Sequence, residues 1–304
     1  MLLSIGIGSI HPLRESFASP RACHFVVPYT TGGIMDVTGR MLAPYLEHAL
    51  AEQLLVENVP GAAGVIGHHQ MLTMAERVDA ASLGSDSDAI LAPLANPSAR
   101  SITGAVKLTG VIGSGPMALV GAGDVTRVVR MLRARGELTC GNYGVDSNSH
   151  LLASEFARRT GARLTHVPYK GIAPVVQDLA GGHIDVAFLP SAGLQLHLDA
   201  GRIRLVGLCS PARSSQFLDV PTVGELFSIG DFSYETWSGL LVSRTAPASF
   251  AERCNAGVRA ALASDEFRRS MEKLGATLAA PMSIAEAEDY FRRAVASALL
   301  LRGG

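Results

Sequence analysis

The stretch from Leu164 to Val223 limits the possible folds more than any other part of the chain, because strand-like and helix-like segments alternate along it. Residues 164–167, 184–189 and 204–208 are short β-prone runs. The segments between them carry apolar residues at helical spacing and end at glycines, as helices commonly do. Repeated strand–helix units predict a parallel sheet, and the ligands of such sheets gather at the carboxyl ends of the strands.

The rest of the chain continues this pattern and predicts an α/β fold with two lobes. Extended residues 106–112 and 118–120 are predicted to cross from the first lobe to the second, and the chain is predicted to return near Pro221–Glu225. Helices near 250–263 and 284–300 would then pack on the first lobe. The other predicted strands lie at residues 25–27, 54–57, 81–84 and 138–140.

The composition narrows the classes of function. Apolar residues make up 48% of the chain and the mean hydropathy is +0.25, which indicates a packed globular protein. Lys and Arg (26) nearly balance Asp and Glu (27), and no basic stripe stands out, so we expect no nucleic-acid or lipid partner. The four cysteines include no C-x-x-C pair, and we therefore expect no metal site.

Four motifs, in one order and over nearly the whole chain from about His24, resemble a single family of binding proteins. They read VVPYTTGGIMDVTGRMLAPYL, CGNYGVDSNSHLLASEF, HVPYKGIAP and DVPTV, and a further segment, YETWSGLLVSRTAPASF, resembles the return of the family to its first lobe. Together they are similar to the Bug family of extracytoplasmic solute receptors, the substrate-binding proteins of tripartite tricarboxylate transporters. The resemblance implies the type II periplasmic-binding-protein fold, with a doubly wound βα sheet in each lobe and a cleft between the lobes. Lobe I would comprise residues 24–112 and 224–304, and lobe II residues 113–223.

The resemblance also implies a function. We expect a periplasmic solute-binding protein that captures a small carboxylate-bearing or amino-acid-like ligand in the cleft for transporter membrane subunits. The alternative is a ligand-sensing receptor that signals to a partner protein without transport. No G-x-S-x-G elbow, Walker loop or Rossmann fingerprint is present, so we expect neither catalysis nor a cofactor.

The N-terminal segment, residues 1–23, is ambiguous. Leu2–Ile10 is an apolar run too short to span a bilayer, and it is typical of the remnant of a secretory signal. No Lys or Arg precedes it, although a signal peptide would have one.

Two loops between a strand and a helix are predicted to bind anions. Glycines let backbone N–H groups turn toward a ligand, and the positive end of the following helix dipole favours a carboxylate. The alternatives are a tight turn with Asp36 as an early-helix acid in the first loop, and plain N-capping by Ser147 or Asn148 in the second. The first loop comprises Tyr29, Thr30, Thr31, Gly32, Gly33 and Asp36, and the second comprises Tyr143, Asp146, Ser147, Asn148 and Ser149.

Two further loops complete the predicted site. Tyr169, Lys170 and Gly171 follow a strand, where the tyrosine would wall the pocket and the lysine would place a positive charge at the rim. A solvated surface lysine is the alternative. Ser85 and Asp86 follow the third strand of the first lobe.

Three acids distinguish the predicted cleft from the pattern of the family. Asp86, Asp88 and Asp146 are predicted to face the cleft, where they would pair with an ammonium and favour a ligand that carries both charges. The alternatives are that Asp86 or Asp88 caps a helix and that Asp146 points to water. Trp237, the only tryptophan, is expected in the core or hinge and not against the ligand.

The first loop generates a direct prediction. Replacing Gly33 by a β-branched residue should abolish solute binding and leave the fold intact, because a side chain there would obstruct the inward-turned N–H groups. Calorimetric titration of the variant tests this, and normal binding would mean that the first loop is misassigned.

Overall fold

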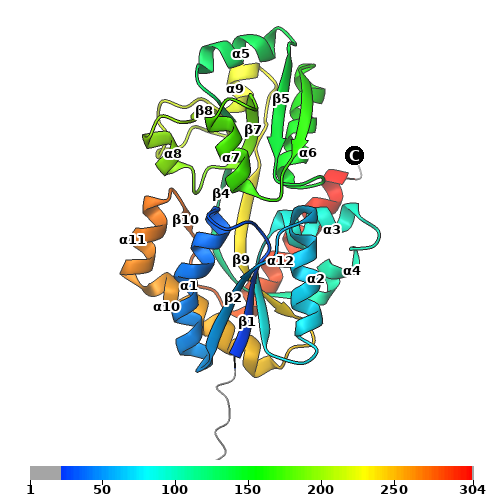
Figure 1. Ribbon diagram of the computed structural model, residues 1–304, viewed down its shortest axis with the longest axis vertical. Helices are drawn as coiled ribbons and strands as arrows, with labels where there is room; N and C mark the ends of the chain where they lie inside the picture. The colour runs from blue at the N-terminus through cyan, green and yellow to red at the C-terminus, as the bar shows by residue number, and fades with distance from the viewer. Residues whose placement is uncertain (1–21, 303–304) are drawn as a thin grey trace, which may run out of the picture.

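The computed structural model describes residues 22–302, with side chains up to Leu299. The N-terminal segment expected at residues 1–23 lies outside the described residues, apart from Ala22 and Cys23. Two lobes lie one above the other along the long axis of the molecule (Figure 1). A single path of paired strands runs through both in the order β2-β1-β3-β9-β4-β7-β5-β6, and β8 and β10 also pair with β4.

Lobe I, the lower lobe in Figure 1, is built on three parallel strands that match the predicted ones closely. They are β1 (Ala22–Val27), β2 (Gln53–Asn58) and β3 (Ala80–Ser85). A short strand, β10 (Thr277–Leu278), pairs with β4. The helices of this lobe are α1 (Ile34–Leu50), α2 (Val65–Met74), α3 (Ala92–Ala95), α4 (Ser101–Ala105), α10 (Ala248–Ala263), α11 (Asp265–Lys273) and α12 (Ile284–Arg302), with a 3-10 turn, η1 (Ala62–Gly64), and a π-helical turn, η2 (Ser87–Leu91).

Lobe II, the upper lobe, repeats the strand–helix alternation seen in the sequence. Its strands β5 (Glu137–Asn142), β6 (Arg163–Pro168) and β7 (Val186–Pro190) are parallel to one another, and β8 (Arg204–Cys209) pairs with β4. The helices are α5 (Val125–Arg133), α6 (Asn148–Thr160), α7 (Ile172–Ala180), α8 (Gln195–Asp199) and α9 (Val223–Phe227).

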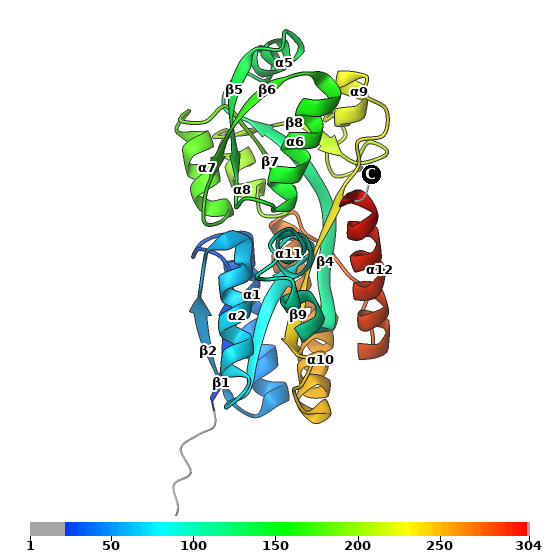
Figure 2. The same cartoon turned by 90° about the vertical axis from the view of Figure 1, so that its right-hand side faces the viewer.

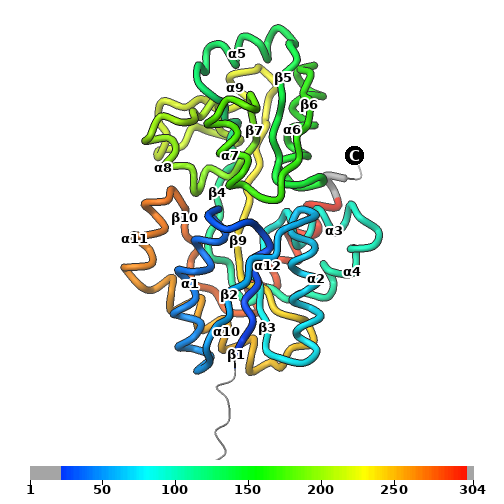
Figure 3. The backbone as a smooth tube through the Cα atoms, viewed as in Figure 1, coloured from blue at the N-terminus to red at the C-terminus, as the bar shows by residue number. Residues whose placement is uncertain are grey.

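Two strands connect the lobes. The extended segments predicted at 106–112 and 118–120 form one long strand, β4 (Val106–Gly121), and the chain returns along β9 (Glu235–Ser243), which pairs with it (Figures 2 and 3). The predicted return near Pro221–Glu225 is wrong. Thr222 and Glu225 instead form a reciprocal capping box that opens α9, and α9 packs against β8 in lobe II. The lobe boundaries in residue numbers stay a prediction.

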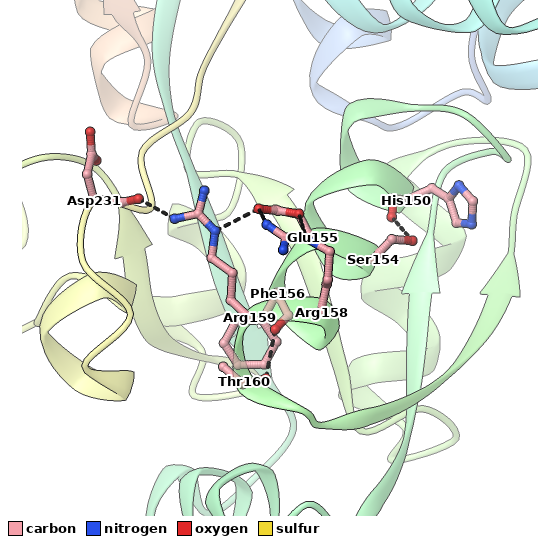
Figure 4. Close-up of polar contacts among 8 residues, drawn as sticks. All are labelled: His150, Ser154, Glu155, Phe156, Arg158, Arg159, Thr160 and Asp231. Atoms are coloured by element: carbon pink, nitrogen blue, oxygen red, sulfur yellow. Dashed lines mark hydrogen bonds and ion pairs between the residues drawn. The ribbon is translucent and has the colours of Figure 1, made fainter. Parts of the chain in front are cut away.

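The core of lobe II gathers aromatic side chains under α6. Phe156 on that helix packs against Phe188 on β7 and against Phe232, with ring centroids 5.6 and 6.0 Å apart. On the outer side, Glu155 binds two arginines of the next turn, and Arg159 Nη1 donates to the carbonyl oxygen of Asp231 at 2.6 Å (Figure 4). These contacts fix α6 to the segment that leads into β9.

The Glu155 cluster predicts an acid-sensitive contribution to stability. The hydrogen bonds from Arg158, with help from Arg159, lower the pKa of Glu155 to about 2, against the effect of burial. A lowered pKa in the folded state stabilises the protein above the ordinary glutamate pKa of about 4.5, and this contribution is lost as the pH falls toward 2. Because the pair is largely solvated, Glu155→Gln should lower the free energy of unfolding by about 1 kcal/mol or less at pH 7.

Urea unfolding from pH 7 to pH 3 measures this contribution. The difference between Glu155→Gln and the wild type should shrink as the pH falls, whereas Glu252→Gln, which removes an exposed carboxylate without a partner among the described residues, should differ little at any pH. A difference that is independent of pH would contradict the ion-pair account.

Candidate functional site

A cavity lies between the lobes, with about 640 Å³ of empty space, part of it open to solvent. Both lobes and both connecting strands contribute to its wall. Among the residues that the structure describes, none with an ionisable acidic or basic side chain lines it, and much of the surface is apolar. The wall comprises Tyr29, Ile34, Met35, Thr38 and Ser85 of lobe I, Gly113–Pro116 and Thr236–Ser238 of the connecting strands, Tyr143, Ile172, Pro190, Ser191 and Ala192 of lobe II, and Met271, Ala276 and Thr277.

Three residues of the predicted site meet in this cavity. They are Tyr29, Ser85 and Tyr143, each from a loop or strand end of the kind that the sequence singled out. The rings of Tyr29 and Tyr143 meet edge to face across the two lobes, with centroids 6.0 Å apart. The rule that ligands sit at the carboxyl ends of parallel strands therefore selected three residues that line this cavity, and their binding of a ligand stays a prediction.

Asp86 does not line the cavity, so the expectation that it faces the cleft is wrong. The side chain is buried and makes no capping bond to its helix. It accepts hydrogen bonds from Asn148 Nδ2 at 3.0 Å, from the Tyr234 hydroxyl at 2.5 Å, and from the hydroxyl of Thr236 and the N–H of Trp237. Burial raises the pKa of Asp86, and these donors oppose the rise.

Asp88 is likewise buried, and it does not line the cavity; it is the second residue of η2, whose N-cap position is Asp86. Its Oδ2 accepts from the Tyr29 hydroxyl at 2.9 Å and from the Ser85 hydroxyl at 2.5 Å. Its Oδ1 accepts from the Ser85 N–H at 2.8 Å and lies 2.6 Å from His68 Nε2, and His68 is itself completely buried. Asp88 therefore orients two residues of the cavity wall, Tyr29 and Ser85, although it does not line the cavity itself.

The second predicted loop serves the fold of the chain more than a ligand. Ser147 is the N-cap of α6, as in the alternative interpretation, and it accepts from the N–H of His150 at 3.3 Å. Asn148 accepts from the Tyr143 hydroxyl and donates to Asp86, and Ser149 donates to the Phe188 carbonyl oxygen at 2.6 Å. These three side chains are buried and lie outside the cavity wall.

In the first predicted loop, too, some hydrogen-bonding groups already have partners within the chain. Asp36 accepts hydrogen bonds from the Gly32 N–H at 2.9 Å, from Arg40 and from Asn58. Burial acts to raise the pKa of Asp36, but these hydrogen bonds outweigh it and hold the pKa below its ordinary value. The Gly32 N–H is therefore occupied by a carboxylate of the protein itself.

Gly33 has no steric need to be glycine. Its φ is −78°, in the extended region, and an added Cβ would lie 3.6 Å from the nearest atom, the Thr30 carbonyl oxygen. The structure thus removes the steric basis for the predicted loss of binding. Gly32, with φ of +84°, is the glycine that the turn requires.

Most of the remaining predicted residues lie where the two lobes meet. Thr31 is exposed, whereas the Thr30 hydroxyl is buried without a partner and would lie 2.7 Å from a Cβ added at Gly171. Asp146, Tyr169 and Lys170 line a second hollow beside the main cavity, together with residues of α2, α3 and η1. Asp146 has φ of +64°, a conformation in which glycine, asparagine and aspartate are favoured, and this explains an acid at that position.

Several residues of the cavity wall were not predicted from the sequence. Ser191 follows β7 and Thr236 lies in β9, and neither belongs to a glycine-rich loop. Ser191 could have been found by the same strand-end rule, but Thr236 carries no sequence signal. Trp237 is 4% exposed and packs against Tyr290 and Phe291, as expected of a core residue, yet it also lines the cavity.

Two α/β lobes that are joined by a pair of long strands and enclose a cavity at their junction define a two-lobed solute-binding protein. The family model for the tripartite tricarboxylate transporter family receptor matches residues 38–291, and the chain belongs to this family. It is a solute receptor of the Bug type.

Individual relatives agree with this membership. The chain is 29% identical to protein BugT of Bordetella pertussis over 293 residues, which covers 91% of this chain and 89% of BugT. The solved structure of MatC from Rhodopseudomonas palustris with bound malate superposes with a TM-score of 0.82 at 20% identity, over 92% of this chain and 98% of MatC. An R. palustris protein solved with adipate gives a TM-score of 0.81 at 23% identity, over 92% and 96% of the two chains.

A close contact between the lobes allows a prediction of how a single substitution would separate them. A Cβ added at Gly144 in lobe II would lie 2.6 to 2.9 Å from the Cβ and backbone of Ala63 in lobe I. Gly144→Ala should therefore push the lobes apart and increase the radius of gyration measured by small-angle scattering.

Gly182→Ala is the matched control for the backbone strain. Gly182 also has a positive φ (+71°), but nothing lies within 4 Å of its added Cβ. Both variants should lose on the order of 1 kcal/mol of stability, and only Gly144→Ala should expand. Equal scattering profiles for the two variants would contradict the proposed contact.

Proposed function

We propose that this receptor is a non-catalytic periplasmic protein that binds a small carboxylate-bearing solute between its lobes and presents it to transporter membrane subunits. The observation that carries the proposal is the cavity at the junction of the lobes, whose wall is drawn from both of them. Relatives solved with malate and adipate support a carboxylate as the ligand class. No described helix is long and apolar enough to cross a membrane.

The donors for a carboxylate would be hydroxyl and backbone N–H groups. The hydroxyls of Ser191, Ser238 and Thr277 line the cavity and have no hydrogen-bond partner within the part of the chain that the structure describes. A carboxylate that accepts several such hydrogen bonds is stable in its ionised form without a cation beside it. The absence of described Lys or Arg from the wall is therefore compatible with an anionic ligand group.

Binding should be visible as thermal stabilisation. A solute present at about 100 times its dissociation constant should add roughly 2.7 kcal/mol to the free energy of unfolding. A thermal-shift screen of C4 to C6 dicarboxylates and aromatic carboxylates should therefore find at least one solute that raises the Tm.

Two variants locate the binding site. Ser191→Ala should weaken the shift, because it removes a free donor from the main cavity. Tyr169→Phe should leave it unchanged, because Tyr169 lines the second hollow and donates to Asp178 at 2.6 Å. A screen in which no carboxylate stabilises the wild type would contradict the proposed ligand class.

A further inference from the structure

Six serine and threonine hydroxyl groups of the cavity wall form two sets with opposite hydrogen-bonding roles. One set, Ser191, Ser238 and Thr277, has free hydroxyl hydrogens, as described above. The other set, Ser85, Thr236 and Ser114, lines the same cavity but donates to carboxylates of the protein. The two sets can be named the free hydroxyls and the acid-backed hydroxyls.

Each acid-backed hydroxyl already donates its only hydrogen to a carboxylate oxygen of the protein. A serine or threonine hydroxyl has one hydrogen to donate and two lone pairs that accept. The hydrogen of Ser85 points to Asp88 Oδ2 at 2.5 Å, that of Thr236 to Asp86 Oδ1, and that of Ser114 to Glu235 Oε1 at 2.5 Å. What these oxygens offer to a solute is therefore a lone pair, and this part of the wall accepts hydrogen bonds.

The surroundings keep Ser85 and Thr236 in this orientation. Asp86 receives two further bonds from groups that can only donate, the Asn148 amide N–H and the Trp237 backbone N–H. Asn148 Nδ2 also donates to the Thr236 hydroxyl oxygen at 3.2 Å, so that this hydroxyl cannot donate back to it. Ser85 donates to Asp88 with both its N–H and its hydroxyl, which fixes its side chain.

The groups behind this wall are acceptors as well. The carboxyl groups of Asp86 and Asp88 are buried directly behind the Thr236 and Ser85 hydroxyls, and no described Lys or Arg lines the cavity. A second carboxylate on the solute would meet lone pairs there with no donor to bond to, which is unfavourable. An ammonium group or a hydroxyl can donate to these lone pairs, and the ammonium forms the stronger, charge-assisted hydrogen bond.

We propose that the solute carries an amino group in addition to its carboxylate, and that this group donates to the acid-backed hydroxyls of Ser85 and Thr236 while the carboxylate accepts from the free hydroxyls. This inference rests on the proposed function and narrows its ligand class to amino-carboxylates. Asp86 and Asp88 act on the solute through the hydroxyls that they orient, and they do not touch it.

Aspartate, malate and succinate test the proposal, because they share a four-carbon dicarboxylate frame and differ only in an amino group, a hydroxyl or a hydrogen at one carbon. Calorimetric titration of the wild type should give affinities in the order aspartate, malate, succinate. Aspartate should bind at least about tenfold more tightly than succinate, as expected for a donor that meets an otherwise unpaired buried acceptor. Succinate binding as tightly as aspartate would overturn the inference and leave the proposed carboxylate receptor intact.

Single substitutions test whether the acid-backed hydroxyls cause the preference for aspartate over succinate. Ser85→Ala and Thr236→Val should each lower the ratio of aspartate to succinate affinity, whereas Thr236→Ser keeps the hydroxyl and should preserve it. Ser191→Ala, a matched change in the free set, should weaken all three solutes by a similar factor. A ratio that is unchanged in both Ser85→Ala and Thr236→Val would contradict the assignment.

Thermal unfolding confirms which variants are folded before they are titrated. If Thr236→Val does not fold because Asp86 has lost a donor, Ser85→Ala and the wild-type series still decide the question. Failure of all three acids and of the wider carboxylate screen to bind would contradict the proposed function, and the inference with it.

Discussion

The structure depends most on one buried carboxylate. Asp86 lies directly after β3 in lobe I, and its four donors come from α6 of lobe II, from β9 and from the segment that leads into β9. A buried charge costs several kcal/mol unless every lone pair is satisfied. Asp86 is satisfied only when the two lobes and the connecting strand come together, so this residue links the arrangement of the lobes to the free energy of the protein.

The cavity wall follows from this arrangement. Asp86 and Asp88 fix the hydroxyl hydrogens of Thr236, Ser85 and Tyr29, and Asn148 fixes that of Tyr143. A rigid set of hydrogen-bonding groups loses little entropy when a solute binds, and it rejects solutes with the wrong pattern of donors and acceptors. The acids thus determine the chemistry of the wall while remaining outside it.

The sequence predicted the strands well, because strands depend on local patterns, whereas the binding role of the predicted site residues stays a prediction. Apolar runs and glycine-rich strand ends gave β1 to β3 and β5 to β8, and the strand-end rule placed Tyr29, Ser85 and Tyr143 at the cavity. The roles of Asp86 and Asp88 could not be predicted in the same way. Their partners Thr236 and His68 are remote in sequence or carry no motif, and only the folded chain brings them together. The return to lobe I was predicted near Pro221–Glu225, but these residues open α9, and the chain returns along β9, within the segment that resembles the return of the family.

The chain contains its own probe of the cavity between the lobes, in which we propose that the solute binds. Trp237 is the only tryptophan, lines the cavity and lies on the strand that connects the lobes. Titration with a carboxylate solute, followed by tryptophan emission, should shift or quench the signal with the same dissociation constant that calorimetry gives. A solute that binds by calorimetry and leaves the Trp237 emission unchanged at saturation would contradict the account, because it would have to bind elsewhere.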